Sequence, residues 1–365
     1  MKMIPVVEPV VHGNELKYLK DCLKSTWLSS GKYVDLFEEK FAKFCEANYA
    51  ASVVNGTAAL HVLLATLGIK KGDEVIIPNL TFVATANAVI YTGAKPVFVD
   101  VDRQTWNIAP QKIEEKITKK TKAIIAVHLY GHPADMDQIN SLAKSYNILV
   151  LEDACEAHGA LYKGRKVGSL SLASCFSFYG NKIITTGEGG MIVSNNKSII
   201  KRANFLKSHS QIAKGIYHHT EIGFNYRFTN LQAALGLAQL ENVNNVIKRK
   251  LENANAYNDL LKDVEDIILP PDEPWARSVF WMYSIVLRRK NLRDKLILKL
   301  ADASIETRPF FEPLHKLPMY KENEDFPNST FLSKNGLSLP SSALLAVKEI
   351  EYICATLKKL LKRSL

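Results

Sequence analysis

An acid and a lysine follow two neighbouring apolar segments of this chain, and together they could hold a cofactor. Asp153 comes just after the apolar run 148–151, and Lys182 comes just after the run 173–178. A lysine that is removed from water becomes a usable nucleophile for a carbonyl group. A carboxylate at the end of a buried strand needs a cationic partner, which a protonated heterocycle nitrogen would provide. Taken singly, Asp153 could equally cap the next helix, and most lysines are solvated surface groups.

A possible phosphate site follows an earlier apolar run. After residues 51–54 the chain reads Asn55-Gly56-Thr57-Ala58, a turn that begins a predicted helix. Gly56 permits a tight turn, and the N–H groups of residues 56 to 58 could bind a phosphate. A simple N-cap of the helix by Asn55 or Thr57 explains the turn about as well. Amides for a phosphate, a lysine for an aldehyde and an acid for a ring nitrogen nevertheless fit one cofactor, pyridoxal 5′-phosphate (PLP).

These residues must be positioned by a sheet whose strands are buried. Near-continuous apolar strands joined by helices are typical of a mostly parallel sheet covered on both faces. Ligands of such α/β sheets bind at the carboxyl ends of the strands, which is where Asp153 and Lys182 are expected. The runs expected to form strands are 51–54, 74–77, 96–101, 123–127, 148–151, 173–178 and 190–193.

The remaining elements divide the chain into two predicted domains. We predict a large PLP-binding domain over residues 1–245, including an N-terminal arm, and a smaller α+β domain over residues 246–365. Helical periodicity covers 14–25 and 34–48. A helix around 230–240 is followed by a long polar helical stretch through about residue 261. Strands are expected at 280–287 and 305–310, and a closing helix is expected at 344–361.

Composition limits the classes of function that remain open. The chain has 365 residues, of which 47% are hydrophobic and 23% charged, as in ordinary globular proteins. No apolar run reaches the roughly 18–20 residues that span a bilayer, and the N-terminus lacks the apolar core of a signal peptide. We therefore expect a cytoplasmic protein with no membrane partner. The five cysteines have no CxxC spacing, so neither a disulfide framework nor a metal site is expected.

The formal net charge of +10 raises the question of a nucleic-acid partner. The basic residues are scattered, and they lack the interleaved aromatic residues of single-strand binders. We therefore expect no nucleic acid as a partner. A basic surface favours a polyanionic small molecule instead, such as a nucleotide or a phosphate ester.

Several motifs along the chain are specific when they are taken together. They are Asn55-Gly56-Thr57-Ala58-Ala59-Leu60, Glu152-Asp153-Ala154, Ser177-Phe178 with Lys182, Thr185-Thr186-Gly187-Glu188-Gly189-Gly190, and Gly223-Phe224-Asn225-Tyr226-Arg227. With them the chain resembles, from about Pro5 to Leu357, the DegT/DnrJ/EryC1/StrS family of PLP-dependent sugar aminotransferases. The resemblance implies an aspartate aminotransferase-like α/β fold (fold type I), with a large, mostly parallel seven-stranded sheet domain and a smaller α+β C-terminal domain.

The resemblance also implies roles for particular residues at the cofactor. Lys182 is expected to form a Schiff base with PLP and to move the proton during catalysis. Asp153 is expected to pair with the pyridinium nitrogen, which keeps the ring an electron sink. The other implied cofactor contacts are Gly56, Thr57, Ala58 and Ser177 at the phosphate, Phe82 stacked on the ring, Glu156 near the ring hydroxyl, and Asn225 at the phosphate of the neighbouring subunit. The contact of Asn225 implies a homodimer with a shared active site.

The reaction expected from the resemblance is amino transfer. Related dehydratases carry histidine in place of the lysine, so Lys182 favours a transaminase. The members most similar to this chain aminate GDP-4-keto-6-deoxymannose with L-glutamate. We therefore expect L-glutamate as donor and this or a related nucleotide-linked 4-keto-6-deoxysugar as acceptor, for O-antigen or capsule biosynthesis. The candidate substrate contacts are Trp27, Ser29, Arg227, Arg308 and His315. Surface ion pairs would equally explain the two arginines. Packing inside the protein would equally explain the histidine.

One segment departs from the most similar members of the family. Residues 207–212 stand where those members have a glycine-rich stretch, and residues 213–220, which include His218 and His219, also differ. In the family this segment lies on the substrate side, so the acceptor stays open. A UDP- or dTDP-linked ketosugar or a small phosphorylated ketone is one alternative. A non-catalytic PLP-binding regulator is another, which the intact Lys182 and Asp153 disfavour.

Overall fold

A seven-stranded sheet forms the centre of the molecule. The computed structural model describes residues 3–213 and 216–362. The strands run in the order β1-β9-β8-β5-β4-β2-β3, and all are parallel except β9, which is antiparallel to both its neighbours. The sheet predicted from the apolar runs is confirmed, with bounds that differ by a residue or two. The strands are β1 (Tyr49–Val53), β2 (Glu74–Pro78), β3 (Lys95–Val99), β4 (Thr121–Val127), β5 (Leu149–Asp153), β8 (Ala173–Ser177) and β9 (Gly190–Ser194).

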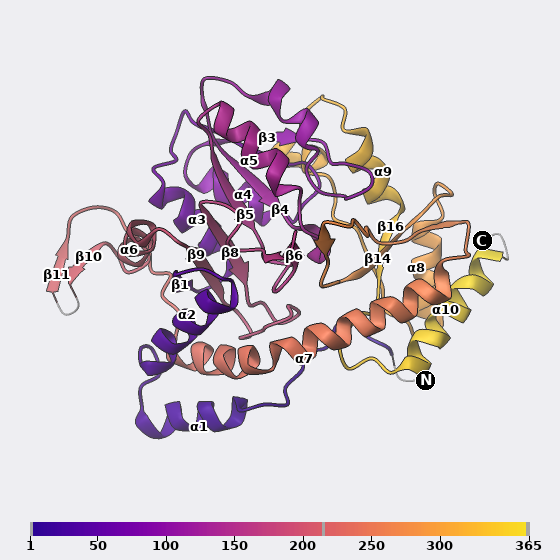
Figure 1. Ribbon diagram of the computed structural model, residues 1–365, viewed down its shortest axis with the longest axis horizontal. Coiled ribbons are helices and arrows are strands. Elements are labelled where there is room, and N and C mark those ends of the chain that lie inside the picture. The colour runs from indigo at the N-terminus through magenta and orange to yellow at the C-terminus, as the bar shows by residue number, and fades with distance from the viewer. Residues whose placement is uncertain (1–2, 214–215, 363–365) are drawn as a thin grey trace.

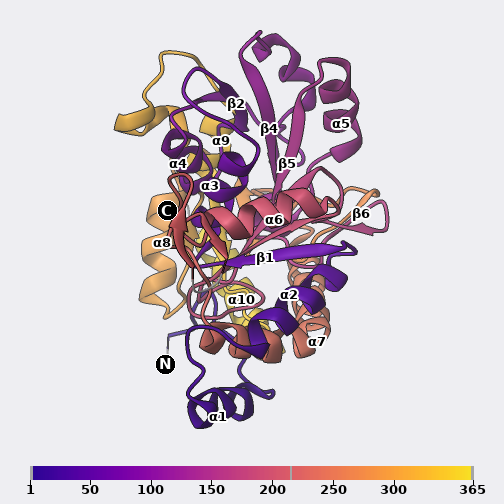
Figure 2. The same ribbon diagram turned by 90° about the vertical axis from the view of Figure 1, so that its left-hand side faces the viewer.

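Alternate residues of these strands face two separate cores, because side chains of a strand point to opposite faces. In β2, Val75 and Ile77 pack in a core with α3, α4 and α6. The side chain between them, Ile76, faces a second core with α2, α5 and α7. Figure 2 shows α2 and α7 on the opposite side of β1 from α6. The helices are α2 (Lys32–Phe44), α3 (Gly56–Thr66), α4 (Ala84–Tyr91), α5 (Met136–Ser145), α6 (Lys197–Leu206) and α7 (Asn230–Leu261).

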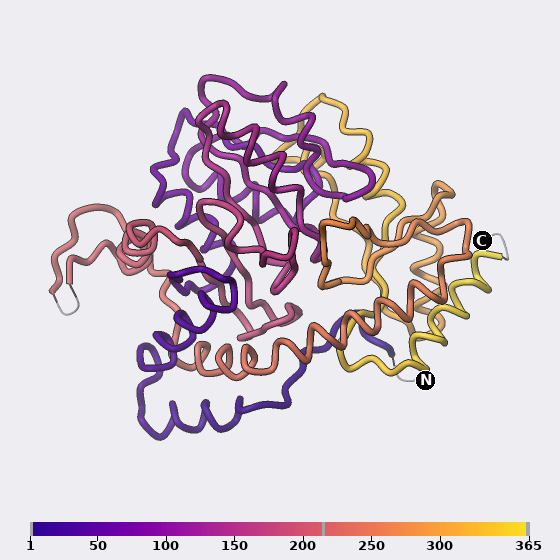
Figure 3. The backbone as a smooth tube through the Cα atoms, in the orientation of Figure 1, coloured from indigo at the N-terminus to yellow at the C-terminus, as the bar shows by residue number. Residues whose placement is uncertain are grey.

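The C-terminal part has a smaller antiparallel sheet and a third core, covered by α8 and α10. Its strand order is β12-β14-β16-β15, and β16 was not predicted from the sequence. The N-terminal arm reaches this part, where Ile4 pairs with Ile305 and the N–H of Ser341 donates to the carbonyl of Val6 at 2.7 Å (Figure 3). The elements are β12 (Ile267–Ile268), β14 (Tyr283–Leu287), α8 (Arg293–Asp302), β15 (Arg308–Pro309), α9 (Pro327–Asn335), β16 (Gly336–Leu339) and α10 (Val347–Lys362).

The 32-residue helix α7 extends without a break from the large sheet to the C-terminal part (Figure 1). It begins after Thr229, which forms a capping box with Gln232: each side chain accepts a hydrogen bond from the backbone N–H of the other residue. The sequence predicted a helix followed by a polar helical stretch, and the structure joins them. The domain boundary proposed near residue 245 falls inside α7, and the division into two domains stays a prediction.

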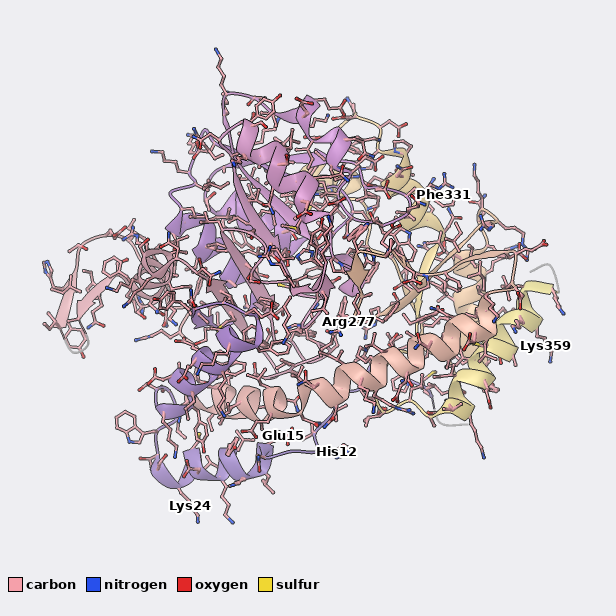
Figure 4. The ribbon with its side chains drawn as sticks, viewed as in Figure 1. His12, Glu15, Lys24, Arg277, Phe331 and Lys359 are labelled. Carbon is pink, nitrogen blue, oxygen red and sulfur yellow. The ribbon has the colours of Figure 1, made fainter. Side chains whose placement is uncertain are left out.

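Helix α1 (Glu15–Ser25) lies on the outside of α7. The side-chain amide of Gln239, in α7, donates to Glu15 Oε1 at 2.7 Å. Figure 4 shows Glu15 at the α7 side of this helix, while Lys24 points away from the molecule. The helices predicted over 14–25 and 34–48 are confirmed as α1 and α2, although α2 begins at Lys32 and ends at Phe44, four residues before the predicted end.

Shorter elements connect these layers. A hairpin of β10 and β11 projects from the body of the molecule (Figure 1). It belongs to the segment 207–220 that departs from the family pattern, of which residues 214 and 215 lie outside the described residues. Among the described residues, none of the helices is both long and apolar enough to span a membrane. The connecting elements are β6 (Leu161–Tyr162), β7 (Arg165–Lys166), β10 (Gln211–Ala213), β11 (Ile216–His219), β13 (Ala276–Arg277) and the 3₁₀ turns Pro110–Lys112, Glu114–Lys116, Leu129–Gly131, Leu314–Lys316 and Pro318–Tyr320.

Candidate active site

A cavity of about 480 Å³ opens at the carboxyl ends of β4, β5 and β8, where the sequence predicted a ligand site. Trp281, Met282 and Arg308 of the C-terminal part line it as well. This volume suits a small-molecule cofactor together with part of a substrate. The predicted site residues that line the cavity are Gly56, Thr57, Phe82, Asp153, Glu156, Ser177, Lys182 and Arg308.

Asp153 is the last residue of β5, and only 6% of its surface is exposed. The hydroxyl of Thr85 donates to its Oδ2 at 2.8 Å, and the N–H of Cys155 donates to its Oδ1 at 3.2 Å. These bonds fix the plane of the carboxylate at the cavity wall and leave it able to accept a further donor. Thr85, in the first turn of α4, was missed from the sequence, because it reaches Asp153 through space from an element far away in the chain.

Glu152 points to the opposite face of β5 from Asp153, as alternation along a strand requires. It is fully buried, and it accepts hydrogen bonds from His128 Nε2 at 3.1 Å and from the N–H of Gly168 at 2.7 Å. The N–H of Leu170 adds a third bond at 3.0 Å. Glu152 therefore holds the loop between β5 and β8, while its neighbour Asp153 faces the cavity.

Lys182 lies in the turn that follows β8, with its ammonium group inside the cavity. Its Nζ is 3.7 Å from Glu156 Oε1 and 3.6 Å from the centre of the Trp281 ring. The indole N–H of Trp281 donates to the carbonyl of Asn181 at 2.8 Å, which ties the ring to the same turn. No sequence pattern indicated Trp281, because it approaches the lysine from the C-terminal part.

Glu156 lies one turn beyond Asp153 and is buried beside Lys182. The N–H of Tyr130 donates to its Oε2 at 2.8 Å. Burial raises the pKa of Glu156 to about 7, although the charge of Lys182 and the bond from Tyr130 act in the opposite direction. Near neutral pH this carboxyl can therefore either hold or release a proton beside the lysine.

The turn at residues 55–58, called the cradle below, begins helix α3 at the cavity and offers backbone N–H groups to an anion. Asn55 Oδ1 accepts from the N–H of Ala58 at 2.8 Å, so Asn55 caps helix α3 as the sequence allowed. The N–H of Ala58 is thus used within the protein, and Ala58 is not among the residues that line the cavity. The N–H groups of Gly56 and Thr57 precede this bond and remain available at the helix start. A Cβ at Gly56 would lie 2.8 Å from Ser177 Cβ, which explains the glycine. Ser177 Oγ accepts from the N–H of Tyr179 at 3.3 Å and keeps its own proton for an anion.

These groups fit PLP by their own chemistry. An amide cradle with the Ser177 hydroxyl suits a phosphate, and a buried carboxylate suits a ring nitrogen that carries a proton. Lys182 lines the same cavity, where its amino group is available to an aldehyde. Phe82, whose ring lies 5.6 Å from that of Phe311, offers an aromatic face at the cavity mouth. The residues present can therefore hold the phosphate, the ring nitrogen and the aldehyde of one molecule.

Three predicted substrate residues lie together in a different place. Trp27, Ser29 and Arg227 line a second hollow of about 690 Å³ between the loop after α1 and the segment before α7. Asn225 is exposed at its edge, where Arg227 Nη2 donates to its Oδ1 at 3.1 Å. The structure of the single chain thus places most of the predicted site residues at the first cavity and three of them at the second hollow.

His315 is apart from both hollows. It is buried, and its backbone N–H and ring nitrogen bond with the side chain of Asn79, with the ring Nδ1 2.9 Å from Asn79 Nδ2. Among the described residues it lines neither hollow, so the packing alternative describes its surroundings in the single chain. Its contact with a substrate stays a prediction.

Comparison with known proteins identifies the family. The model of the DegT/DnrJ/EryC1/StrS aminotransferase family matches residues 9–358. This chain belongs to that family. It is 48% identical to a GDP-perosamine synthase of Escherichia coli O157:H7, covering 98% of this chain and 99% of that one. It is 42% identical to a GDP-perosamine synthase of Vibrio cholerae, with 98% of both chains covered.

Solved structures give the same result for the fold. The Helicobacter pylori aminotransferase PseC, involved in the biosynthesis of pseudoaminic acid, superposes with a TM-score of 0.95 at 27% identity, covering 99% of this chain and 100% of that one. Spr1654 of Streptococcus pneumoniae, 27% identical to this chain with a TM-score of 0.94, has been solved in a PLP form and in a PMP form. The chain is thus a PLP-dependent aminotransferase of the aspartate aminotransferase-like fold, and PLP, expected from the sequence, is confirmed as its cofactor.

Proposed function

We propose that this enzyme transfers the amino group of L-glutamate to GDP-4-keto-6-deoxymannose and so forms GDP-perosamine, for O-antigen or capsule biosynthesis. The observation that carries the amino-transfer chemistry is the meeting of Lys182, Asp153 and the start of α3 at one cavity. The identity to two GDP-perosamine synthases over nearly the full length supports the acceptor. The net charge of +10 also favours a polyanionic nucleotide sugar.

Bound PLP supplies an aldehyde that takes up the amino group and a ring that withdraws electrons from the reacting carbon. Asp153 holds the proton on the ring nitrogen, and Thr85 keeps the carboxylate in the orientation that this contact needs. Gly56, Thr57 and Ser177 bind the phosphate. Phe82 covers one face of the ring.

With PLP bound, Lys182 would hold its aldehyde through Nζ, and the same amino group would carry the proton that amino transfer requires. Its Nζ stays inside the cavity because the face of Trp281 and the carboxyl of Glu156 both attract a cation. Glu156 lies close enough to exchange a proton with the lysine side of the cavity. Arg308, at the cavity wall, is placed to pair with an anionic group of a substrate.

The active enzyme is proposed to be a homodimer whose sites are shared. Asn225 and Arg227 are exposed on the single chain, and Trp27 and Ser29 lie in the hollow beside them. In a dimer these residues of one subunit would complete the cavity of the other, with Asn225 at the phosphate and Trp27, Ser29 and Arg227 at the nucleotide sugar. His315 is retained as a candidate on the sugar side.

The experiment that tests the acceptor separates the two halves of the reaction. The purified enzyme is converted with L-glutamate to the PMP form, freed of glutamate and mixed with GDP-4-keto-6-deoxymannose while the visible spectrum is recorded. Return of the PLP band and an aminated GDP-sugar in the mass spectrum are expected. Normal conversion by glutamate without return of the band would contradict this acceptor; UDP- and dTDP-ketosugars and phosphorylated ketones would then be tried.

The lysine is tested by substitution. Lys182→Ala is expected to abolish the visible band of the lysine-linked cofactor and to reduce turnover by at least about 10³-fold, because both the linkage and the proton transfer are lost. The exposed Lys290→Ala serves as a matched control and should behave as the unaltered enzyme. Turnover retained in Lys182→Ala would overturn the assignment. Failure of the unaltered enzyme to react with glutamate would favour the non-catalytic regulator.

A further inference from the structure

The segment Gly223–Arg227 has two faces with different surroundings. Phe224 and Tyr226 point inward, stacked on each other with ring centres 5.2 Å apart, and Phe224 lies 4.6 Å from the ring of His61. Asn225 and Arg227 alternate with them and are exposed. The inward pair therefore determines where the outward pair is presented.

The backbone of this segment is held from both sides. On one side the N–H of Tyr226 donates to the carbonyl of Lys207 at 3.0 Å. On the other side the carbonyl of Tyr226 accepts from the N–H of Val54 at 3.0 Å, directly before the cradle that begins at Asn55. Asn225 itself pairs with Ser208 in an antiparallel bridge. The position of Asn225 is thus set by the chain at residues 207 and 208 and by the end of β1.

Lys207 is a buried cation that joins these two sides. Only 7% of the residue is exposed, and its Nζ donates to the carbonyl of Ser52 in β1 at 2.7 Å and to Glu38 Oε1 at 3.2 Å. The same carboxylate oxygen accepts the N–H of Ser52 at 2.7 Å. Burying an ammonium group is costly unless its donors are satisfied, as they are here. The side chain of Lys207 therefore binds β1, while its backbone carbonyl binds the N–H of Tyr226.

We infer that Lys207 is a positioning residue for the active site of the opposite subunit: it fixes the segment 223–227 against β1, so that Asn225 is presented to the partner's cofactor phosphate. The inference rests on the proposed shared site. It predicts that loss of Lys207 weakens cofactor binding in the subunit that receives Asn225. The subunit that carries the substitution is affected much less at its own cavity, because Lys207 lines the second hollow and is not among the described residues that line the first.

Hybrid dimers test this directly. One subunit carries Lys182→Ala, so the single intact site combines Lys182 of the second subunit with Asn225 of the first. The two subunits carry different affinity tags, and hybrids are isolated by sequential purification. The readout is the apparent dissociation constant of PLP, followed through the visible band of the lysine-linked cofactor, which only the intact site can give.

Lys207→Met is placed either in the first subunit, which donates Asn225, or in the second. We expect the dissociation constant to rise about tenfold in the donor arrangement and to stay within about twofold in the other. Lys201→Met, an exposed lysine of α6, is the matched control and should have no effect in either arrangement. A general folding defect would act in both arrangements, and that outcome overturns the inference, as does an effect confined to the second subunit.

Asn225→Ala in the same two arrangements separates this inference from the proposal on which it rests. An effect of Asn225→Ala in the donor arrangement, without an effect of Lys207→Met, overturns the role of Lys207 and leaves the shared site standing. An effect of Asn225→Ala only in the second subunit overturns both.

Discussion

At the scale of single residues, Glu156 is the residue whose surroundings most directly affect how the stability of the protein depends on pH. Its carboxyl is buried between the cation of Lys182 and the N–H of Tyr130, and its pKa is about 7 because desolvation outweighs both. The ordinary value is 4.5. Between these two pH values the folded protein binds a proton at this position that the unfolded chain has released. The protonated carboxyl of Glu156 therefore favours the folded state fully below pH 4.5, and this stabilisation is lost as the pH rises to about 7.

Glu156→Gln tests this sign in the cofactor-free protein. The amide cannot ionise, so the variant should lack the destabilisation that the unaltered protein acquires as the pH rises from 4.5 to about 7. Relative to the unaltered protein, the variant should gain on the order of 2–3 kcal/mol in unfolding free energy between pH 4.5 and 8. Denaturant unfolding across this range measures the difference, with the exposed Glu265→Gln as control. A difference that does not change with pH would contradict the raised pKa.

Sequence patterns located the chemical groups better than the groups that orient them. Asp153 and Lys182 follow strands, and that position can be read from a linear pattern. Thr85 acts on Asp153 through space from α4, and Trp281 acts on Lys182 from the C-terminal part. The proposed contact of Asn225 with the partner's cofactor phosphate, in turn, is implied by the family resemblance and not by any periodicity.

At the scale of elements, the buried strands were predictable because each is a short, nearly continuous apolar run. Such a run is typical of a strand in a sheet that is covered on both faces. The strand β16 (Gly336–Leu339) was missed because its four residues follow α9 directly and stop at Pro340, so they show too little alternation to be distinguished from a loop. Helix α7 was expected as two stretches because its second half is mostly polar, and only some of the residues there are buried. Its continuity depends on tertiary contacts on several sides, which a sequence pattern does not display.

Packing between α2 and α7 leads to a prediction for Gly236. A glycine inside a helix usually costs about 1 kcal/mol relative to alanine. Here a Cβ would lie 2.7 Å from Phe37 Cζ and 2.9 Å from Thr186 Cγ2. Phe37 is fully buried against Phe178, with ring centres 5.1 Å apart, so it has little room to move.

Gly236→Ala is therefore expected to destabilise the protein by about 1–3 kcal/mol in spite of the better helix propensity. Urea unfolding followed by circular dichroism measures the change. Asn244→Ala, at an exposed position of the same helix, should be neutral or slightly stabilising. A stabilising effect of Gly236→Ala would show that α2 shifts to accept the methyl group.

At the scale of the whole molecule, the net charge of +10 acts on every anionic substrate before contact. A nucleotide sugar carries more negative charge than glutamate, so its rate of encounter with the enzyme should fall more strongly as salt is added. We expect kcat/KM for the ketosugar to fall several-fold between about 20 and about 200 mM NaCl, and that for glutamate to fall less, because the Debye length shortens over this range. Steady-state kinetics at constant pH measure both. Equal salt dependence of the two substrates would contradict long-range attraction of the nucleotide.

The unbroken course of α7 has a consequence for anyone who recombines members of this family. Its 32 residues span roughly 48 Å at about 1.5 Å per residue, and they carry packing surfaces for both ends of the molecule. A chimaera that joins the N-terminal half of one relative to the C-terminal half of another within this helix would pair two half-helices whose buried faces were selected against different neighbours. Crossover points before Thr229 or after Leu261 keep the helix from a single parent, and libraries of chimaeras should yield folded proteins chiefly from those points.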